Sequence, residues 1–156
     1  MVYASGFGEV GEDGVKRNQG LVEAAGKIPI IGPFCYGLIS SLDDVALGPD
    51  LHGCEALDKG VAIISQSGNI GLNMTMQSIG LPIAYMFTLG NQANTSISDI
   101  INAVLDDDRV CTIGLHMEGV SDIEAFDNAG RRALEKKIPI VAIKNGRTNT
   151  SSQIAL

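Results

Sequence analysis

The feature that most constrains the fold of this sequence is a regular alternation of short apolar runs with helical stretches in its second half. The apolar runs cover residues 61–64, 83–89, 110–115 and 139–143, and each is continuous, without polar residues at every second position. A continuous run indicates a strand that is buried on both faces. Each run ends in small or polar residues of the kind that open a turn.

Helical periodicity fills the gaps between these runs. Apolar residues recur three or four positions apart from about Asn69 to Ser78, again after Ser96 or Ser98, and again after Asp122. Strand–helix–strand order with short connections favours right-handed crossovers and a parallel sheet with helices on both faces. We therefore predict an α/β fold, a flavodoxin-like (Rossmann-like) three-layer domain with a parallel sheet, over residues 60–156.

The first part of the chain is less regular. Residues 2–4 and 28–31 have the composition of strands, and a helix is expected over residues 13–25. Two strands and one helix are too little for a free-standing domain. Residues 1–40 are therefore expected either to dock on the second domain or to end a larger one, and residues 41–59 are expected to be a linker.

Composition excludes several classes of function. A net charge of −7 argues against nucleic acid and against an anionic membrane as partners. No apolar run approaches the roughly 20 residues that span a bilayer. The three cysteines, Cys35, Cys54 and Cys111, are far apart and have neither zinc-type nor disulfide-framework spacing. We expect reduced thiols in a cytoplasmic protein, and no metal site.

One turn is a candidate anion site. Residues 65–71 read Ser-Gln-Ser-Gly-Asn-Ile-Gly and join an apolar run to a helix. Ligands of open parallel sheets bind beyond the carboxyl ends of the strands, and the unpaired N–H groups at a helix N-terminus favour an anion. One interpretation is phosphate binding at Ser67, Gly68, Asn69 and Ile70. The alternative is a serine-capped turn that binds nothing.

Two other strand ends carry polar side chains. Glu118 lies two residues past His116 and is expected to face the same rim as Ser67. A carboxylate there can accept a hydrogen bond from an imidazole and fix its tautomer, although a solvated loop acid is the alternative. His116 lies inside an apolar run and is expected to be packed in the core. Asn91 and Gln92 either bond a ligand or close a turn.

Six segments in a fixed order carry a resemblance to a known family. They are residues 5–9 (Ser-Gly-Phe-Gly-Glu), 31–37 (Ile-Gly-Pro-Phe-Cys-Tyr-Gly), 61–68 (Val-Ala-Ile-Ile-Ser-Gln-Ser-Gly), 89–93 (Leu-Gly-Asn-Gln-Ala), 116–119 (His-Met-Glu-Gly) and 140–147 (Ile-Val-Ala-Ile-Lys-Asn-Gly-Arg). Together they resemble the NDP-forming acyl-CoA synthetases, which include ADP-forming acetate–CoA ligases and are similar to the α subunit of succinyl-CoA synthetase. The resemblance spans essentially the whole chain.

The resemblance implies a layout and a reaction. Residues 1–40 would be the C-terminal part of a CoA-binding Rossmann-like domain. In the family, a nucleoside triphosphate phosphorylates a histidine, the phosphoryl group passes to a carboxylic acid, and CoA attacks the resulting acyl phosphate. The helix that opens at Ser67 would hold the phosphate, and Glu118 would be the catalytic acid that contacts the phosphohistidine. The residues that would border CoA are Gly6, Phe7, Cys35, Tyr36 and Gly37.

The resemblance also implies what this chain lacks. The family's histidine lies shortly after the region of Lys144 and Arg147, and we expect the sequence, which ends at Leu156, to stop short of it. Many relatives have Asn where this chain has Phe34. We expect a fragment of a larger ligase that is inactive alone. In the full enzyme its partners would be CoA, a small carboxylic acid and an ATP-grasp domain or subunit, which would bind ATP or ADP with Mg.

Other interpretations of the sequence stay open. A non-catalytic module that binds CoA or phosphate would carry the same turns. A flavin protein or response regulator is disfavoured, since no acidic cluster accompanies a phosphoacceptor site. Unpaired sheet edges would also allow a homodimer.

Overall fold

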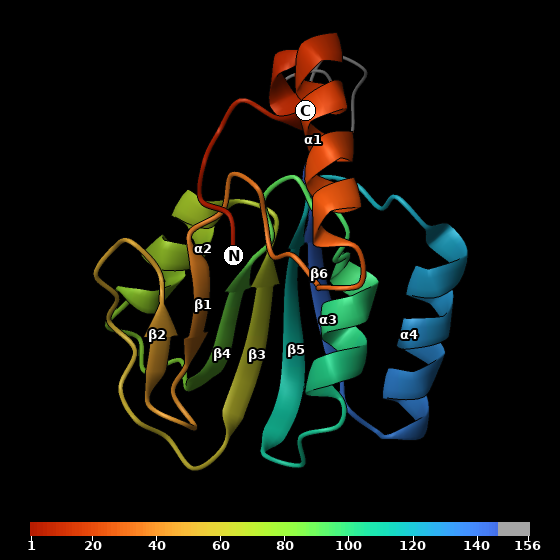
Figure 1. Cartoon of the computed structure of the whole chain (residues 1–156). Coiled ribbons are helices and arrows are strands. Elements are labelled where there is room, and N and C mark those ends of the chain that lie inside the picture. The colour runs from red at the N-terminus through yellow and green to blue at the C-terminus, as the bar shows by residue number, and fades with distance from the viewer. Residues whose placement is uncertain (147–156) are drawn as a thin grey trace.

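The computed structural model describes residues 1–146, which form one six-stranded sheet with helices on both faces (Figure 1). The strands are β1 (Gly37–Ser40), β2 (Val45–Leu47), β3 (Gly60–Ser65), β4 (Ile83–Thr88), β5 (Val110–Met117) and β6 (Ile140–Lys144). The helices are the 3-10 helix η1 (Gly8–Val10) and α1 (Glu12–Ala25), α2 (Gly68–Thr75), α3 (Ile97–Val104) and α4 (Ile123–Glu135). Across the sheet the strand order is β2-β1-β4-β3-β5-β6.

The parallel part of the sheet consists of the four continuous apolar runs. β3 lies between β4 and β5 and pairs in parallel with both, and β5 pairs in parallel with β6. Neighbouring side chains of β3 point to opposite faces, and both Ile63 and Ile64 are buried. The predicted α/β, flavodoxin-like arrangement of three layers is therefore confirmed.

Two hydrophobic cores hold these layers together. The larger core packs α3 and α4 on one face of the sheet and includes the fully buried Ile64 and Ile101. The smaller core lies on the other face, where Met74 of α2 packs against a cluster that includes Ile63 and Met86. Full burial of such a side chain stabilises the fold by about 1.5–3 kcal/mol. The position of α2, which starts at the predicted anion site, is thus fixed by packing.

The parallel sheet predicted for residues 60–156 is confirmed for β3 to β6, but two antiparallel strands from earlier in the chain extend it. β1 pairs antiparallel with both β4 and β2, so the sheet is mixed. β2 lies inside residues 41–59, the predicted linker. With four and three residues, β1 and β2 are too short to give a periodic signal in the sequence.

The segment before β1 docks on the loop between β4 and α3. The predicted helix at 13–25 is confirmed as α1, but residues 2–4 and 28–31 form no strand, contrary to prediction. The side chain of Asn94 accepts a hydrogen bond from the Ile30 amide at 2.7 Å and donates one to the Ile28 carbonyl at 3.0 Å. These contacts attach the first part of the chain to the sheet.

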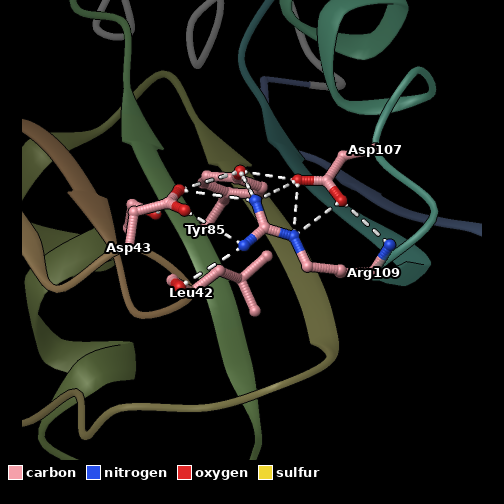
Figure 2. Close-up of polar contacts among 6 residues, drawn as sticks. Leu42, Asp43, Tyr85, Asp107 and Arg109 are labelled. Carbon is pink, nitrogen blue, oxygen red and sulfur yellow. Dashed lines mark hydrogen bonds and ion pairs between the residues drawn. The ribbon is translucent and has the colours of Figure 1, made fainter.

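A polar cluster around Arg109 joins the β1–β2 turn to the start of β5 (Figure 2). The guanidinium donates to Asp43 at 3.0 Å and to Asp107 at 2.8 Å, and its Nη2 also donates to the Tyr85 hydroxyl at 3.3 Å. Tyr85 in turn donates to Asp107 at 2.8 Å. Hydrogen bonds from Arg109 outweigh burial and hold the pKa of Asp107 well below its usual range. Every charged group of this cluster therefore has a partner inside it.

The three cysteines are free thiols, as their spacing predicts. Cys35 is buried, Cys54 is half-buried and Cys111 is exposed. Within residues 1–146, no helix combines the length and apolar character that crossing a membrane requires.

Candidate functional site

A cavity of about 430 Å³ lies where β3, β4 and β5 end. Five of the predicted site residues line it: Tyr36, Ser67, Gly68, Asn69 and Glu118. The other lining residues are Glu9, Phe34, Gln66, Gly90 and Asn91. The lining residues come from five separate segments of the chain, and three of these directly follow β3, β4 and β5, because the carboxyl ends of parallel strands meet at one edge of the sheet.

The N-terminus of α2 offers two free amides to this cavity. Ser67 caps the helix, and its Oγ accepts a hydrogen bond from the Ile70 amide at 3.5 Å. Within residues 1–146, the amides of Gly68 and Asn69 donate no hydrogen bond. Unpaired N–H groups at this end of a helix attract anions. Of the four predicted phosphate-binding residues, Gly68 and Asn69 therefore present N–H groups, and Ile70 uses its own for the cap.

The ring of Tyr36 forms a wall beside these amides. A Cβ atom placed on Gly68 would lie 2.0 Å from Cδ2 of Tyr36, so only glycine allows the ring this close. The Tyr36 amide donates to the Thr88 hydroxyl at 2.8 Å, which anchors the start of β1 to the end of β4. The aromatic wall is thus anchored to β4, which lies between β1 and β3 in the sheet.

Glu118 lies in a turn whose backbone is held by two side chains. Gln66 Oε1 accepts from the amides of Glu118 and Gly119, and its Nε2 donates to the Gly119 carbonyl at 2.7 Å. Lys144 Nζ donates to the Glu118 carbonyl at 2.8 Å. In the part of the chain that the structure describes, the Glu118 carboxylate itself accepts no hydrogen bond and forms no ion pair. It is half-buried and available to a ligand in the cavity.

Glu9 is a second carboxylate at the cavity, and its sequence context predicts no role for it. It accepts hydrogen bonds from the Gly6 and Phe7 amides and from the side chain of Asn91. Burial opposes its ionisation, but these hydrogen bonds outweigh burial and lower the pKa of Glu9. The amides of Gly6 and Phe7 are therefore occupied within the chain.

The residues predicted to border CoA do not all face this cavity. Tyr36 lines it, whereas Gly37 begins β1 and Cys35 is buried. The Cys35 sulfur lies 3.5 Å from the Val2 carbonyl oxygen, and burial raises the pKa of its thiol. CoA binding by this set stays a prediction.

His116 is a core residue, as predicted. It is 4% exposed, and its Nδ1 lies 3.3 Å from Ser65 Oγ while its Nε2 lies 2.8 Å from Nδ2 of Asn145. The Ser65 hydroxyl donates to the Ser67 carbonyl and Nδ2 of Asn145 can only donate, so Nδ1 of His116 donates to Ser65 and its Nε2 accepts from Asn145. His116 thus ties the ends of β3, β5 and β6 together beneath the cavity.

The fold and the cavity define an α/β domain of flavodoxin type with a cradle of two free amides, on Gly68 and Asn69, at the strand ends. Residues 58–156, more than half of the chain, match the family described as "Succinyl-CoA ligase like flavodoxin domain". The chain belongs to this family. Arg147, the last residue of the sixth motif, lies outside the described residues.

Curated relatives and solved structures agree with this assignment. The α subunit of acetate–CoA ligase (ADP-forming) I of Pyrococcus furiosus is 33% identical over 160 residues, which cover 99% of this chain and 34% of that protein. A trans-feruloyl-CoA synthase of an unknown prokaryote is 29% identical over 162 residues, covering 99% of this chain and 23% of that protein. The chain thus spans about a third or less of the length of these relatives.

Two solved structures share the fold over nearly the whole chain. PH0766 from Pyrococcus horikoshii superposes with a TM-score of 0.85 at 29% identity, covering 98% of this chain and 35% of that one. The dinucleotide-forming acetyl-coenzyme A synthetase 1 of Candidatus Korarchaeum cryptofilum, solved with phosphate and ADP, superposes with a TM-score of 0.81 at 27% identity. That match covers 99% of this chain and 33% of the synthetase.

Proposed function

We propose that this chain is the phosphoryl-holding part of an NDP-forming acyl-CoA synthetase, a ligase that joins a small carboxylic acid to CoA. The observation that carries the proposal is the pairing of two free amides, on Gly68 and Asn69, with the unpartnered carboxylate of Glu118 around one cavity within residues 1–146. The named activities of the relatives support the same reaction class.

In this proposal the chain stabilises a phosphohistidine that comes from outside the described residues. Neither histidine of the sequence, His52 or His116, is among the residues that line the cavity. The amides of Gly68 and Asn69 would neutralise the phosphoryl oxygens, and Glu118 would accept the hydrogen bond of the imidazole. The phosphoryl group would then pass to the carboxylate of the acid, and the CoA thiol would displace phosphate from the acyl phosphate.

An NMR titration of the chain with inorganic phosphate tests the cradle. We expect saturable shifts at the Gly68 and Asn69 amides. Proline is tolerated in the first turn of a helix, so Asn69→Pro removes one of the free donors without removing an intrahelical bond. It should weaken phosphate binding by about tenfold. Asn69→Ala keeps the N–H and is the matched control; equal weakening by both variants would contradict the proposed cradle.

The remaining partners also stay proposals. CoA, the acid, an ATP-grasp domain or subunit with ATP and Mg, and a cytoplasmic location follow from the proposed ligase. A homodimer is proposed because β6 is an outer strand whose Val141 and Ile143 are 62% and 57% exposed. Sedimentation of the chain over a range of concentrations tests this, and a monomer throughout that range would rule it out.

A further inference from the structure

The turn after β5 is held almost entirely by one side chain. Glu118 and Gly119 carry four backbone polar groups, and Gln66 bonds three of them: both N–H groups and the Gly119 carbonyl. Lys144 bonds the fourth, the Glu118 carbonyl. The turn is therefore tied to the residue after β3 and to the last residue of β6. These two strands are the neighbours of β5 in the sheet.

Regular strand pairing does not reach this turn. The last backbone hydrogen bonds beside it run from the Gln66 amide to the His116 carbonyl at 3.0 Å and from the Asn145 amide to the Met117 carbonyl at 2.8 Å. Beyond them, side chains replace the backbone ladder. Without the Gln66 side chain, the turn would keep only the Lys144 contact and would sample other conformations.

Only a carboxamide makes this set of bonds. Oε1 must accept two N–H groups while Nε2 donates to a carbonyl, and this pattern determines the orientation of the Gln66 side-chain carboxamide. Glutamate at position 66 would keep the two acceptor bonds but would place an oxygen against the Gly119 carbonyl. Methionine has a similar length and would keep none of the bonds.

We infer that Gln66 is the positioning residue that aims the Glu118 carboxylate at the imidazole of a phosphohistidine. The inference rests on the proposed function. Gln66 acts on the turn backbone, which leaves both carboxylate oxygens of Glu118 without a partner among the described residues. A hydrogen-bond acceptor that is held in place before its ligand arrives binds without the entropic cost of ordering the turn.

Two small ligands distinguish the contribution of Glu118 to binding from that of the two free amides. Inorganic phosphate reports on the Gly68 and Asn69 amides, whereas zwitterionic N-phosphoimidazole adds a ring N–H that Glu118 can accept. We expect the wild-type chain to bind phosphoimidazole about tenfold more tightly than phosphate, by NMR titration or calorimetry. Gln66→Met should bring this ratio close to one, Gln66→Glu should lower it partly, and Glu118→Gln should abolish it.

The outcomes distinguish the inference from the proposed function. A wild-type chain that binds neither ligand would refute the proposed function and the inference with it. If the wild-type ratio is retained in Gln66→Met, or if both affinities fall in proportion, Gln66 has at most a structural role and the inference is overturned. Amide spectra of each variant check that the fold is intact, and Gln66→Glu provides the reading should Gln66→Met fail to fold.

Discussion

The polar clusters at the two ends of the parallel sheet differ in whether their groups already have hydrogen-bond partners within the chain. At the end where β5 begins, Arg109, Asp43, Asp107 and Tyr85 bond one another (Figure 2). At the end where β5 stops, the free Gly68 and Asn69 amides and the Glu118 carboxylate line a cavity without such partners among residues 1–146. A cluster that satisfies its own groups stabilises the fold, whereas one that leaves donors and acceptors unpaired is prepared for a ligand.

The largest effect is expected where the site depends on close packing. Gly68→Ala would push a methyl group into the Tyr36 ring, and overpacking of this kind destabilises by about 1–3 kcal/mol. A methyl group placed on Gly130 of α4 would meet no described atom within 4 Å, so Gly130→Ala is the control and should stabilise by up to about 1 kcal/mol. Chemical denaturation measures both, and equal responses would show that Tyr36 does not restrict position 68.

A similar loss of stability is expected beneath the cavity. Ser65 is fully buried and bonds the Ser67 carbonyl, the Ser67 amide and His116 Nδ1. Ser65→Ala leaves those groups unpaired, which should cost about 1–3 kcal/mol in the free energy of unfolding. It should also weaken phosphate binding, since Ser67 caps α2. An unchanged denaturation midpoint would argue that water replaces the hydroxyl.

The parts of the fold that the sequence predicts are those with long, uniform patterns. β3 to β6 are continuous apolar runs, and α3 and α4 carry clear apolar stripes, so their type and order follow from local sequence. β1 and β2 are too short for such a pattern. The antiparallel pairing of β1 depends on contacts with β4, a strand distant along the chain, and such contacts leave no mark on the local sequence.

The candidate site likewise contains residues that the local sequence predicts and residues that it does not. Ser67, Gly68, Asn69 and Glu118 were predictable because turns after parallel strands gather at one edge. The roles of Glu9 and Gln66 were not, although both lie in motifs of the sequence. Glu9 contacts Asn91, 82 positions along the chain, and Gln66 contacts Glu118, 52 positions along. The direction of a side chain across strands depends on the folded structure.

A smaller effect, and one that depends on pH, is expected for the Arg109 cluster. Arg109→Met should lower the midpoint of thermal unfolding at neutral pH because Asp43 and Asp107 lose their cation. Hydrogen bonds from Arg109 lower the pKa of both carboxyl groups in the folded state below the 3.8 of a free side chain. Their contribution is therefore fully present well above pH 3.8 and is lost as the pH falls through the lowered values. The difference between wild type and variant should shrink in acid; a constant difference would contradict this account.

The smallest effect on stability is expected for Glu118→Gln, and it gives the sharpest contrast with Arg109. The carboxylate has no hydrogen-bond or ion-pair partner within residues 1–146, and glutamine keeps its size, so unfolding free energy should change by less than about 0.5 kcal/mol. Denaturation curves of Glu118→Gln and Arg109→Met, recorded side by side with phosphoimidazole titrations, separate the two ends of the sheet. Loss of ligand preference without loss of stability marks Glu118 as a group kept for binding. A clear loss of stability would instead place it with the self-bonded cluster around Arg109.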